Sequence, residues 1–298
     1  MNKIHISYCP VCNSQQLSAF TKCNDHSISK EDFQIMKCDN CGFLFTQDFP
    51  DESLIGEYYK SKDYISHSNS RKGLINNVYH IARTIMLNRK AKIVCKESGM
   101  EKGKLLDIGC GTGYFLHTMK KMGWDVMGVE KSDDASKVAK EHFNIDVKNL
   151  LNEVDDNNKY DVITLWHVME HLQDLKGTFE KLRSLLKDDG TLIVAVPNSE
   201  SFDAEYYKEN WAAYDVPRHL WHFNATTLGI LSKREEFKIE KFGPMPLDAF
   251  YISMLSEKLQ GKSCSFFRGM LIGIKALNSA LTNPRKSSSL IFILRKSK

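Results

Sequence analysis

The feature that most constrains this chain is a short apolar run that leads directly into a glycine-rich turn. Gly109, Gly111 and Gly113 follow the run LLDI at residues 105–108, and a helix-like stretch begins at Tyr114. Glycine has no Cβ atom to keep a ligand from the backbone, and the free N–H groups at the start of a helix attract a carboxylate or phosphate. The sequence therefore predicts a strand, a ligand-binding loop and a helix in succession.

Short apolar runs alternate with helical patterns from residue 104 onward. Such alternation is typical of an α/β fold with a doubly wound, mostly parallel sheet. The seven predicted strands are LLDI (105–108), DVMGV (125–129), IDV (145–147), YDVITLW (160–166), TLIVAV (191–196), FKIEKF (237–242) and SLIFILR (289–295). Ahead of them, apolar residues recur every three to four positions from Leu74 to Val94, which predicts an amphipathic helix.

An acidic residue supports the interpretation of the glycine loop as a ligand site. Glu130 follows the run DVMGV, where a carboxylate can accept hydrogen bonds from both hydroxyls of a ribose. The loop reads Asp-x-Gly-x-Gly-x-Gly, whereas dinucleotide sites space their glycines as G-x-G-x-x-G. The spacing thus disfavours a nicotinamide dinucleotide, and the remaining alternative is a tight turn that binds nothing.

Residues 105–113 and Glu130 closely resemble the first motif of class I S-adenosylmethionine-dependent methyltransferases. The resemblance runs from about residue 104 to residue 198 and continues more weakly to residue 298. It implies a Rossmann-like fold with S-adenosylmethionine as cofactor, with Asp107 and the loop on the methionine end and Glu130 on the ribose. The cofactor-binding residues implied in this way are Asp107, Gly109, Cys110, Gly111, Gly113 and Glu130.

Within this class the chain is similar to the branch of ubiquinone-biosynthesis O-methyltransferases and of methyltransferases from surface-polysaccharide gene clusters. Three stretches carry the similarity: WHVMEHL (166–172), VPN (196–198) and PRHLWHF (217–223). The similarity implies a small-molecule, sugar or lipid-linked acceptor, methylated at a hydroxyl. Histidine suits removal of the hydroxyl proton because its ordinary pKa lies near neutrality. The candidates are His167, His219 and His222, with Arg218 to hold an anionic group of the acceptor.

Two C-x-x-C pairs lie near the N-terminus. Cys9 and Cys12 form the first pair, Cys38 and Cys41 the second, and 25 residues separate the pairs. Four thiolates at this spacing suit a tetrahedral, structural Zn²⁺, which would stabilise a segment too short to bury a large core. We therefore predict a zinc-ribbon-like module; the alternative is a set of reduced cysteines without a metal.

The segment His167-Val-Met-Glu170-His171 matches the inverted zinc-peptidase pattern H-x-x-E-H. That pattern belongs inside a helix, but here a predicted strand ends at Trp166. A metal held by His167 and His171 is therefore disfavoured. We expect His167 to line the active site and His171 to pack one turn into the next helix.

We expect three parts: the zinc-ribbon-like module (1–48), a helical linker region (49–100) and the methyltransferase domain (101–298). The last contains an aromatic-rich lid (198–224) and a helical insertion (247–283). The lid aromatics either sandwich a flat or sugar-like acceptor or simply pack the lid on the domain. The insertion, with its basic flank, either covers the substrate pocket or meets a membrane or lipid-linked substrate.

The 41 basic and 37 acidic residues give a net charge of +4, too small to indicate nucleic-acid binding by itself. No secretory signal or membrane span is predicted, so we expect a cytoplasmic protein. Two other functions stay open, a nicotinamide-dependent oxidoreductase and a nucleic-acid-binding or RNA-modifying protein that uses the zinc ribbon. The nucleobase amino-methylating family would carry Asn-Pro-Pro-aromatic after YDVITLW, where this chain has WHVMEH.

Overall fold

The structure is a computed structural model that describes residues 3–59, 74–261 and 263–297. The chain forms two compact units, each assembled from separate stretches. The first unit comprises Met1–Tyr64, His167–Leu175 and Ala195–Phe292, and the second comprises Ile65–Trp166, Lys176–Val194 and Ile293–Lys298.

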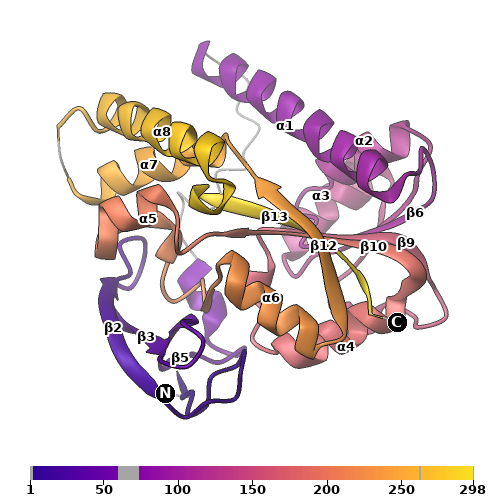
Figure 1. Ribbon diagram of the computed structural model, residues 1–298. Helices are drawn as coiled ribbons and strands as arrows, with labels where there is room; N and C mark the ends of the chain where they lie inside the picture. Colours follow the sequence, from indigo (N-terminus) through magenta and orange to yellow (C-terminus); the bar gives the residue numbers. More distant parts are fainter. Residues whose placement is uncertain (1–2, 60–73, 262, 298) are drawn as a thin grey trace. The chain divides into compact units, whose positions relative to one another are not determined.

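Seven strands form one sheet in the order β12-β13-β10-β9-β6-β7-β8 (Figure 1). The strands are β6 (Lys104–Ile108), β7 (Asp125–Val129), β8 (Asp146–Lys148), β9 (Tyr160–Trp166), β10 (Leu186–Pro197), β12 (Phe237–Pro244) and β13 (Ser289–Lys296). β6 pairs in parallel with β7 and β9, and β7 pairs in parallel with β8. The predicted seven-stranded α/β sheet is confirmed, and each apolar run lies in one of its strands.

Helices connect these strands in the second unit. They are α1 (Leu74–Ser98), α2 (Tyr114–Lys121), α3 (Asp133–Phe143) and α4 (Leu175–Leu185), with a short 3₁₀ helix η2 (Leu151–Glu153). α3 begins where the Ser132 hydroxyl accepts a hydrogen bond from the Ala135 N–H, a normal N-terminal cap. The helix predicted from Leu74 to Val94 is confirmed as part of α1.

A 3₁₀ helix, η3 (Met169–His171), follows β9 directly. The prediction that His171 lies inside the next helix is wrong, because α4 starts only at Leu175. Leu172 has extended backbone angles, so the single turn that contains His171 ends there. The neighbouring prediction, that the strand ends at Trp166 and leaves His167 at its end, is confirmed.

The first unit contains a second, four-stranded sheet in the order β11-β4-β3-β2. Its strands are β2 (Leu17–Asn24), β3 (Asp32–Cys38), β4 (Leu44–Thr46) and β11 (Trp221–His222), and a separate pair joins β1 (Lys3–Ile4) to β5 (Phe49–Pro50). β11 pairs antiparallel with β4, so a segment late in the chain completes the N-terminal sheet. The 3₁₀ helix η1 spans Ile55–Tyr59.

The remaining elements of the first unit are mostly helical. They are α5 (Phe202–Tyr207), η4 (Lys208–Asn210), η5 (Ala212–Tyr214), α6 (Ala225–Arg234), α7 (Asp248–Leu259), α8 (Ser265–Thr282) and η6 (Pro284–Lys286). Asn224 caps α6 through its side chain, which accepts a hydrogen bond from the Thr227 N–H. The predicted helical insertion is the pair α7 and α8, which lie side by side (Figure 1).

Most aromatic residues between 198 and 224 belong to the hydrophobic core of the first unit. Tyr207, Trp211 and Tyr214 pack in one buried cluster with Phe33 and Ile35 of β3. Tyr206 is the aromatic of this segment that stays exposed. The geometry favours the packing alternative for the buried aromatics, because side chains without accessible faces have no surface left for an acceptor.

Within the described residues, none of the helices combines the length and apolar character that a membrane crossing requires.

Two glycines of α8 let it approach α7 closely. A Cβ atom built on Gly269 would lie 2.6 Å from Met254 Cα and 2.8 Å from Met254 N. On Gly273 it would lie 2.7 Å from Phe250 Cδ1. The close contact at Gly269 is with backbone, which cannot rotate away, so this position tolerates no side chain without movement of a helix.

We expect Gly269→Ala to destabilise the protein. In an exposed helix this change would stabilise by about 1 kcal/mol, but forcing a methyl group into a packed contact costs about 1–3 kcal/mol. The measurement is chemical denaturation, with Asn278→Ala on the exposed face of α8 as the control expected to leave stability nearly unchanged. A more stable Gly269→Ala protein would show that α7 and α8 are not in close contact.

Candidate functional site

The glycine loop joins β6 to α2 and is built from left-handed backbone. Gly109, Gly111 and Gly113 have φ angles of 69°, 55° and 79°. A Cβ atom on Gly113 would lie 2.7 Å from Ala139 Cβ, so close packing as well as conformation requires glycine there. A Cβ atom on Gly111 would meet nothing within 4 Å. The backbone at Gly111 is therefore open to a ligand.

Asp107 stands at the start of this loop with its carboxylate turned into the protein. The Thr164 hydroxyl donates to Asp107 Oδ1 at 2.6 Å, and Asp107 is only 3% exposed. Burial raises the pKa of Asp107 to about 7, although the Thr164 hydrogen bond opposes this rise. A buried carboxyl group of this kind favours a cationic partner.

Glu130 braces the loop from the end of β7. One oxygen accepts a hydrogen bond from the Gly111 N–H and the other from the Ser132 N–H, both at 2.8 Å. A carboxylate has about four acceptor positions, so each oxygen keeps one for a further donor such as a ribose hydroxyl. The buried Trp166 Nε1–H has no acceptor among the described residues. These features fit a nucleoside with a charged amino-acid end.

A histidine between two carboxylates follows β9 in the chain. His167 Nε2 lies 3.0 Å from Asp248 Oδ2, and its Nδ1 lies 3.4 Å from Glu170 Oε1. Burial alone would lower the pKa of His167, but the two carboxylates outweigh it and raise the pKa to about 10. The backbone of His167 is left-handed, with φ of 59°. His167 is therefore an imidazolium at neutral pH and cannot accept a proton.

Two further histidines adjoin Glu170. One ligand atom each from Glu170, His171 and His219 lie within 4.8 Å of one another. The imidazoles of His171 and His219 meet edge to face, with 4.6 Å between ring centroids. Burial lowers the pKa of His171 to about 4, so this ring is neutral. The H-x-x-E-H pattern therefore splits, since His167 pairs with Asp248 while His171 adjoins His219.

The other two predicted acceptor-site residues are enclosed by protein. Arg218 is 1% exposed and donates to Asp25, Asp215 and the Tyr58 carbonyl. Burial lowers the pKa of His222 to about 3, and its Nε2 lies 3.1 Å from the Thr46 hydroxyl. Both side chains thus have partners within the first unit.

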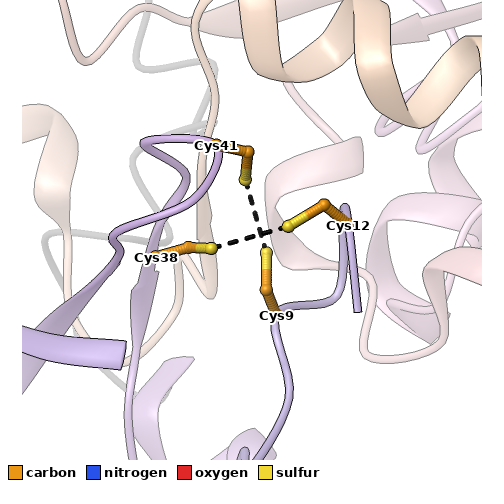
Figure 2. A group of neighbouring side chains, drawn as sticks. All are labelled: Cys9, Cys12, Cys38 and Cys41. Carbon is orange, nitrogen blue, oxygen red and sulfur yellow. Dashed lines mark hydrogen bonds between the residues drawn. The ribbon is translucent and has the colours of Figure 1, made fainter. Parts of the chain in front are cut away.

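The four predicted zinc ligands converge in the first unit (Figure 2). The sulfurs of Cys9 and Cys41 lie 3.6 Å apart, and those of Cys12 and Cys38 lie 3.5 Å apart. Tetrahedral Zn²⁺ with bonds of about 2.3 Å would separate its sulfurs by about 3.8 Å. The donor set and spacing fit one zinc ion.

The two C-x-x-C turns share one backbone design. The residue after each second cysteine, Asn13 or Gly42, is left-handed, with φ of 60° or 77°. In each turn the N–H of this residue donates a hydrogen bond to the carbonyl of the first cysteine of the pair, from Asn13 to Cys9 and from Gly42 to Cys38. In addition, the Asn40 amide donates to Cys12 Sγ at 3.4 Å. Such turns direct both sulfurs of a pair to one point.

Comparison with known proteins decides the family. A family described as "methyltransferase domain" matches residues 81–241, more than half of the chain. The chain belongs to this methyltransferase family. The fold and family predicted from the glycine loop are thereby confirmed.

Named relatives of this methyltransferase include two ubiquinone biosynthesis O-methyltransferases. The protein of Glaesserella parasuis is 33% identical over 122 residues, which are 37% of this chain and 52% of that protein. The protein of Rhodopseudomonas palustris is 30% identical over 136 residues, 42% of this chain and 53% of that protein. The chain thus spans about half the length of the curated relatives it matches.

A solved structure confirms the fold. Magnesium protoporphyrin IX methyltransferase from Synechocystis, with bound S-adenosylhomocysteine, aligns with a TM-score of 0.54 at 13% identity. The alignment covers 83% of this methyltransferase and 100% of that chain. At this identity the likeness concerns the fold alone.

Several residues that shape these clusters were not singled out from the sequence. Thr164 lies inside the apolar strand β9, and the presence of a polar residue in this run was the sequence signal that could have identified it. Asp248 lies 81 residues from His167, and Asp25 lies 193 residues from Arg218, whereas Asp215 is only three residues before Arg218. No local pattern in the sequence pairs Asp248 or Asp25 with its cationic partner.

We expect His167 of the methyltransferase to stay protonated through pH 8. Its pKa is raised in the fold, so its ion pairs stabilise the protein fully below about pH 6.5 and fade as the pH rises through about 10. Asp248→Asn should lower this pKa by about one to three pH units. NMR titration of the imidazole measures both values, with Asp134→Asn as the control. Titration of the wild-type ring near pH 6.5 would contradict the arrangement.

Proposed function

We propose that this methyltransferase transfers the methyl group of S-adenosylmethionine to a hydroxyl oxygen of a small-molecule, sugar or lipid-linked acceptor. The observation that carries the proposal is the glycine loop, where the open backbone at Gly111 lies beside the carboxylates of Asp107 and Glu130. The family match supports methyl transfer over hydride transfer, the chemistry of the nicotinamide alternative.

The residues of the loop divide the cofactor between them. Asp107, whose burial favours a cationic partner, would face the α-ammonium of the methionine end. Glu130 would accept hydrogen bonds from the ribose hydroxyls with its remaining acceptor positions. Gly109, Cys110, Gly111 and Gly113 would supply the backbone that lies against the ligand. When bound, the cofactor supplies a sulfonium methyl group that is already a strong electrophile.

The histidine–carboxylate cluster is where we place the proton-handling groups. His167 is cationic, so its role is to donate a hydrogen bond or to balance charge rather than to act as a base. His222 is enclosed and bonded to Thr46, which leaves His219, with its neighbour His171, to meet an acceptor hydroxyl. Arg218 we assign to positioning this loop, since Asp25 and Asp215 already occupy its guanidinium.

A hydroxyl acceptor is supported by the relatives named as ubiquinone biosynthesis O-methyltransferases, which methylate oxygen by name. The nucleic-acid alternative rests on the cysteine cluster alone, which suits a structural metal equally well.

We expect Glu130→Ala to weaken S-adenosylmethionine binding about tenfold to a hundredfold. The change removes a charged acceptor from the ribose and from the Gly111 and Ser132 N–H groups, and a hydrogen bond to a charged group contributes about 1.5–3 kcal/mol. Isothermal titration calorimetry measures the affinity, and Glu141→Ala on the exposed face of α3 is the matched control.

The same protein should release S-adenosylhomocysteine when S-adenosylmethionine is offered with a hydroxyl acceptor. A panel of catechol-like phenols, sugar nucleotides and lipid-linked glycans covers the three acceptor classes. Retention of NAD instead of S-adenosylhomocysteine on purification, or equal affinity of the wild type and Glu130→Ala, would contradict the assignment.

We further propose that Cys9, Cys12, Cys38 and Cys41 hold one structural Zn²⁺. Support comes from the sulfur spacing and from the two matched left-handed turns. A closed set of four thiolates leaves no position for a substrate, so the ion would stabilise the hairpins rather than take part in methyl transfer. The remaining cysteines of the chain lie outside this cluster.

Metal analysis should find about one zinc ion per chain from this cluster, and Cys38→Ser should lower that content and the melting temperature together. The control is Cys264→Ser, which changes an exposed cysteine outside the cluster. Zinc-free protein with the same melting temperature as zinc-loaded protein would refute the structural role.

A further inference from the structure

Two histidines of the first unit lie beside the buried carboxylate of Glu170, and each has its Nδ1 next to a backbone carbonyl. His171 Nδ1 lies 3.0 Å from the Arg218 carbonyl, and His219 Nδ1 lies 2.7 Å from the Ala213 carbonyl. A carbonyl oxygen can only accept, so a hydrogen on Nδ1 satisfies each carbonyl and leaves the Nε2 lone pair of the neutral ring for another partner; the Tyr59 hydroxyl also lies 3.0 Å from His171 Nδ1. A ring fixed through its other nitrogen in this way is typical of a metal ligand.

The carboxylate beside them lacks the donors that a buried charge requires. Glu170 is 0% exposed, and neither of its oxygens accepts a hydrogen bond from the described residues. His167 approaches one oxygen at 3.4 Å, which gives charge attraction without a hydrogen bond. A buried carboxylate without hydrogen-bond donors destabilises the fold unless an ion or a water molecule completes its contacts.

The ligand atoms are also held in place by the backbone. Glu170 and His171 lie in η3, and the Leu220 N–H donates to the Glu170 carbonyl at 2.8 Å. The hydroxyl of Thr46 in β4 donates to the His219 carbonyl at 2.8 Å. Both peptide segments are fixed before an ion arrives, which lowers the conformational entropy that binding would cost.

We propose that Glu170, His171 and His219 form a second metal site, which takes one divalent transition-metal ion. Two imidazole nitrogens and one carboxylate oxygen suit Zn²⁺, Fe²⁺ and similar ions, whereas Mg²⁺ and Ca²⁺ prefer oxygen ligands throughout. Three protein ligands leave coordination positions open to water or to an oxygen of a substrate. This site therefore differs in kind from the closed four-cysteine cluster.

Cobalt titration of the full chain tests the site. With the cysteine cluster loaded with zinc, calorimetry should detect one Co²⁺ ion per chain, and the visible spectrum should lack thiolate-to-cobalt charge-transfer bands. His219→Ala and Glu170→Gln should each weaken binding at least about tenfold. His142→Ala and Glu141→Gln, both on the exposed face of α3, are the matched controls and should bind as the wild type does.

Zinc content and S-adenosylmethionine affinity, measured on the same samples, report whether each variant is folded. If a variant does not fold, the melting temperature decides: Co²⁺ should raise it in the wild type and in His142→Ala. The site is overturned if the wild type does not bind Co²⁺, or if Glu170→Gln and His219→Ala both bind Co²⁺ as tightly as the wild type does. Co²⁺ binding without S-adenosylmethionine binding would refute the proposed function and leave the metal site standing.

Discussion

Arg218 joins four stretches of the first unit, three through its buried guanidinium and one through its backbone carbonyl. The guanidinium donates to Asp25 in the turn after β2, to the Tyr58 carbonyl in η1 and to Asp215 in its own loop. The backbone carbonyl of Arg218 lies 3.0 Å from His171 Nδ1. A guanidinium removed from water is stable only when its donors are satisfied. The position of the loop that carries Arg218 and His219 therefore depends on the N-terminal strands, because its ion pairs include Asp25.

The glycine loop of the second unit depends on a comparable constraint. Its three glycines adopt left-handed backbone, and the carboxylate of Glu130 holds both Gly111 and Ser132 by their N–H groups. Left-handed turns are flexible unless something fixes them. Glu130 therefore holds the loop in place, and the residue that we propose for ribose binding is also part of the scaffold.

The sequence predicted the fold well because its signals were local. Each of the seven strands appears as an apolar run, the loop glycines stand at fixed spacing, and the cysteine pairs carry their turn residues with them. The histidine cluster was harder to predict. His167, His171 and His219 were visible in the sequence, but their partners, which are Asp248, Glu170 and two backbone carbonyls, are brought in by tertiary contacts. The aromatics of residues 198–224 were ambiguous for the same reason, since only burial separates a core side chain from a binding surface.

The pairing of β11 with β4 has a consequence for synthesis of the protein. β4 lies between β3 and β11, so its outer edge has no partner until Trp221 and His222 leave the ribosome. An open strand edge is a template for pairing with other chains. Leu44 and Phe45 are buried in the folded protein, but they form an open strand edge in the growing chain until residues 221 and 222 have been made.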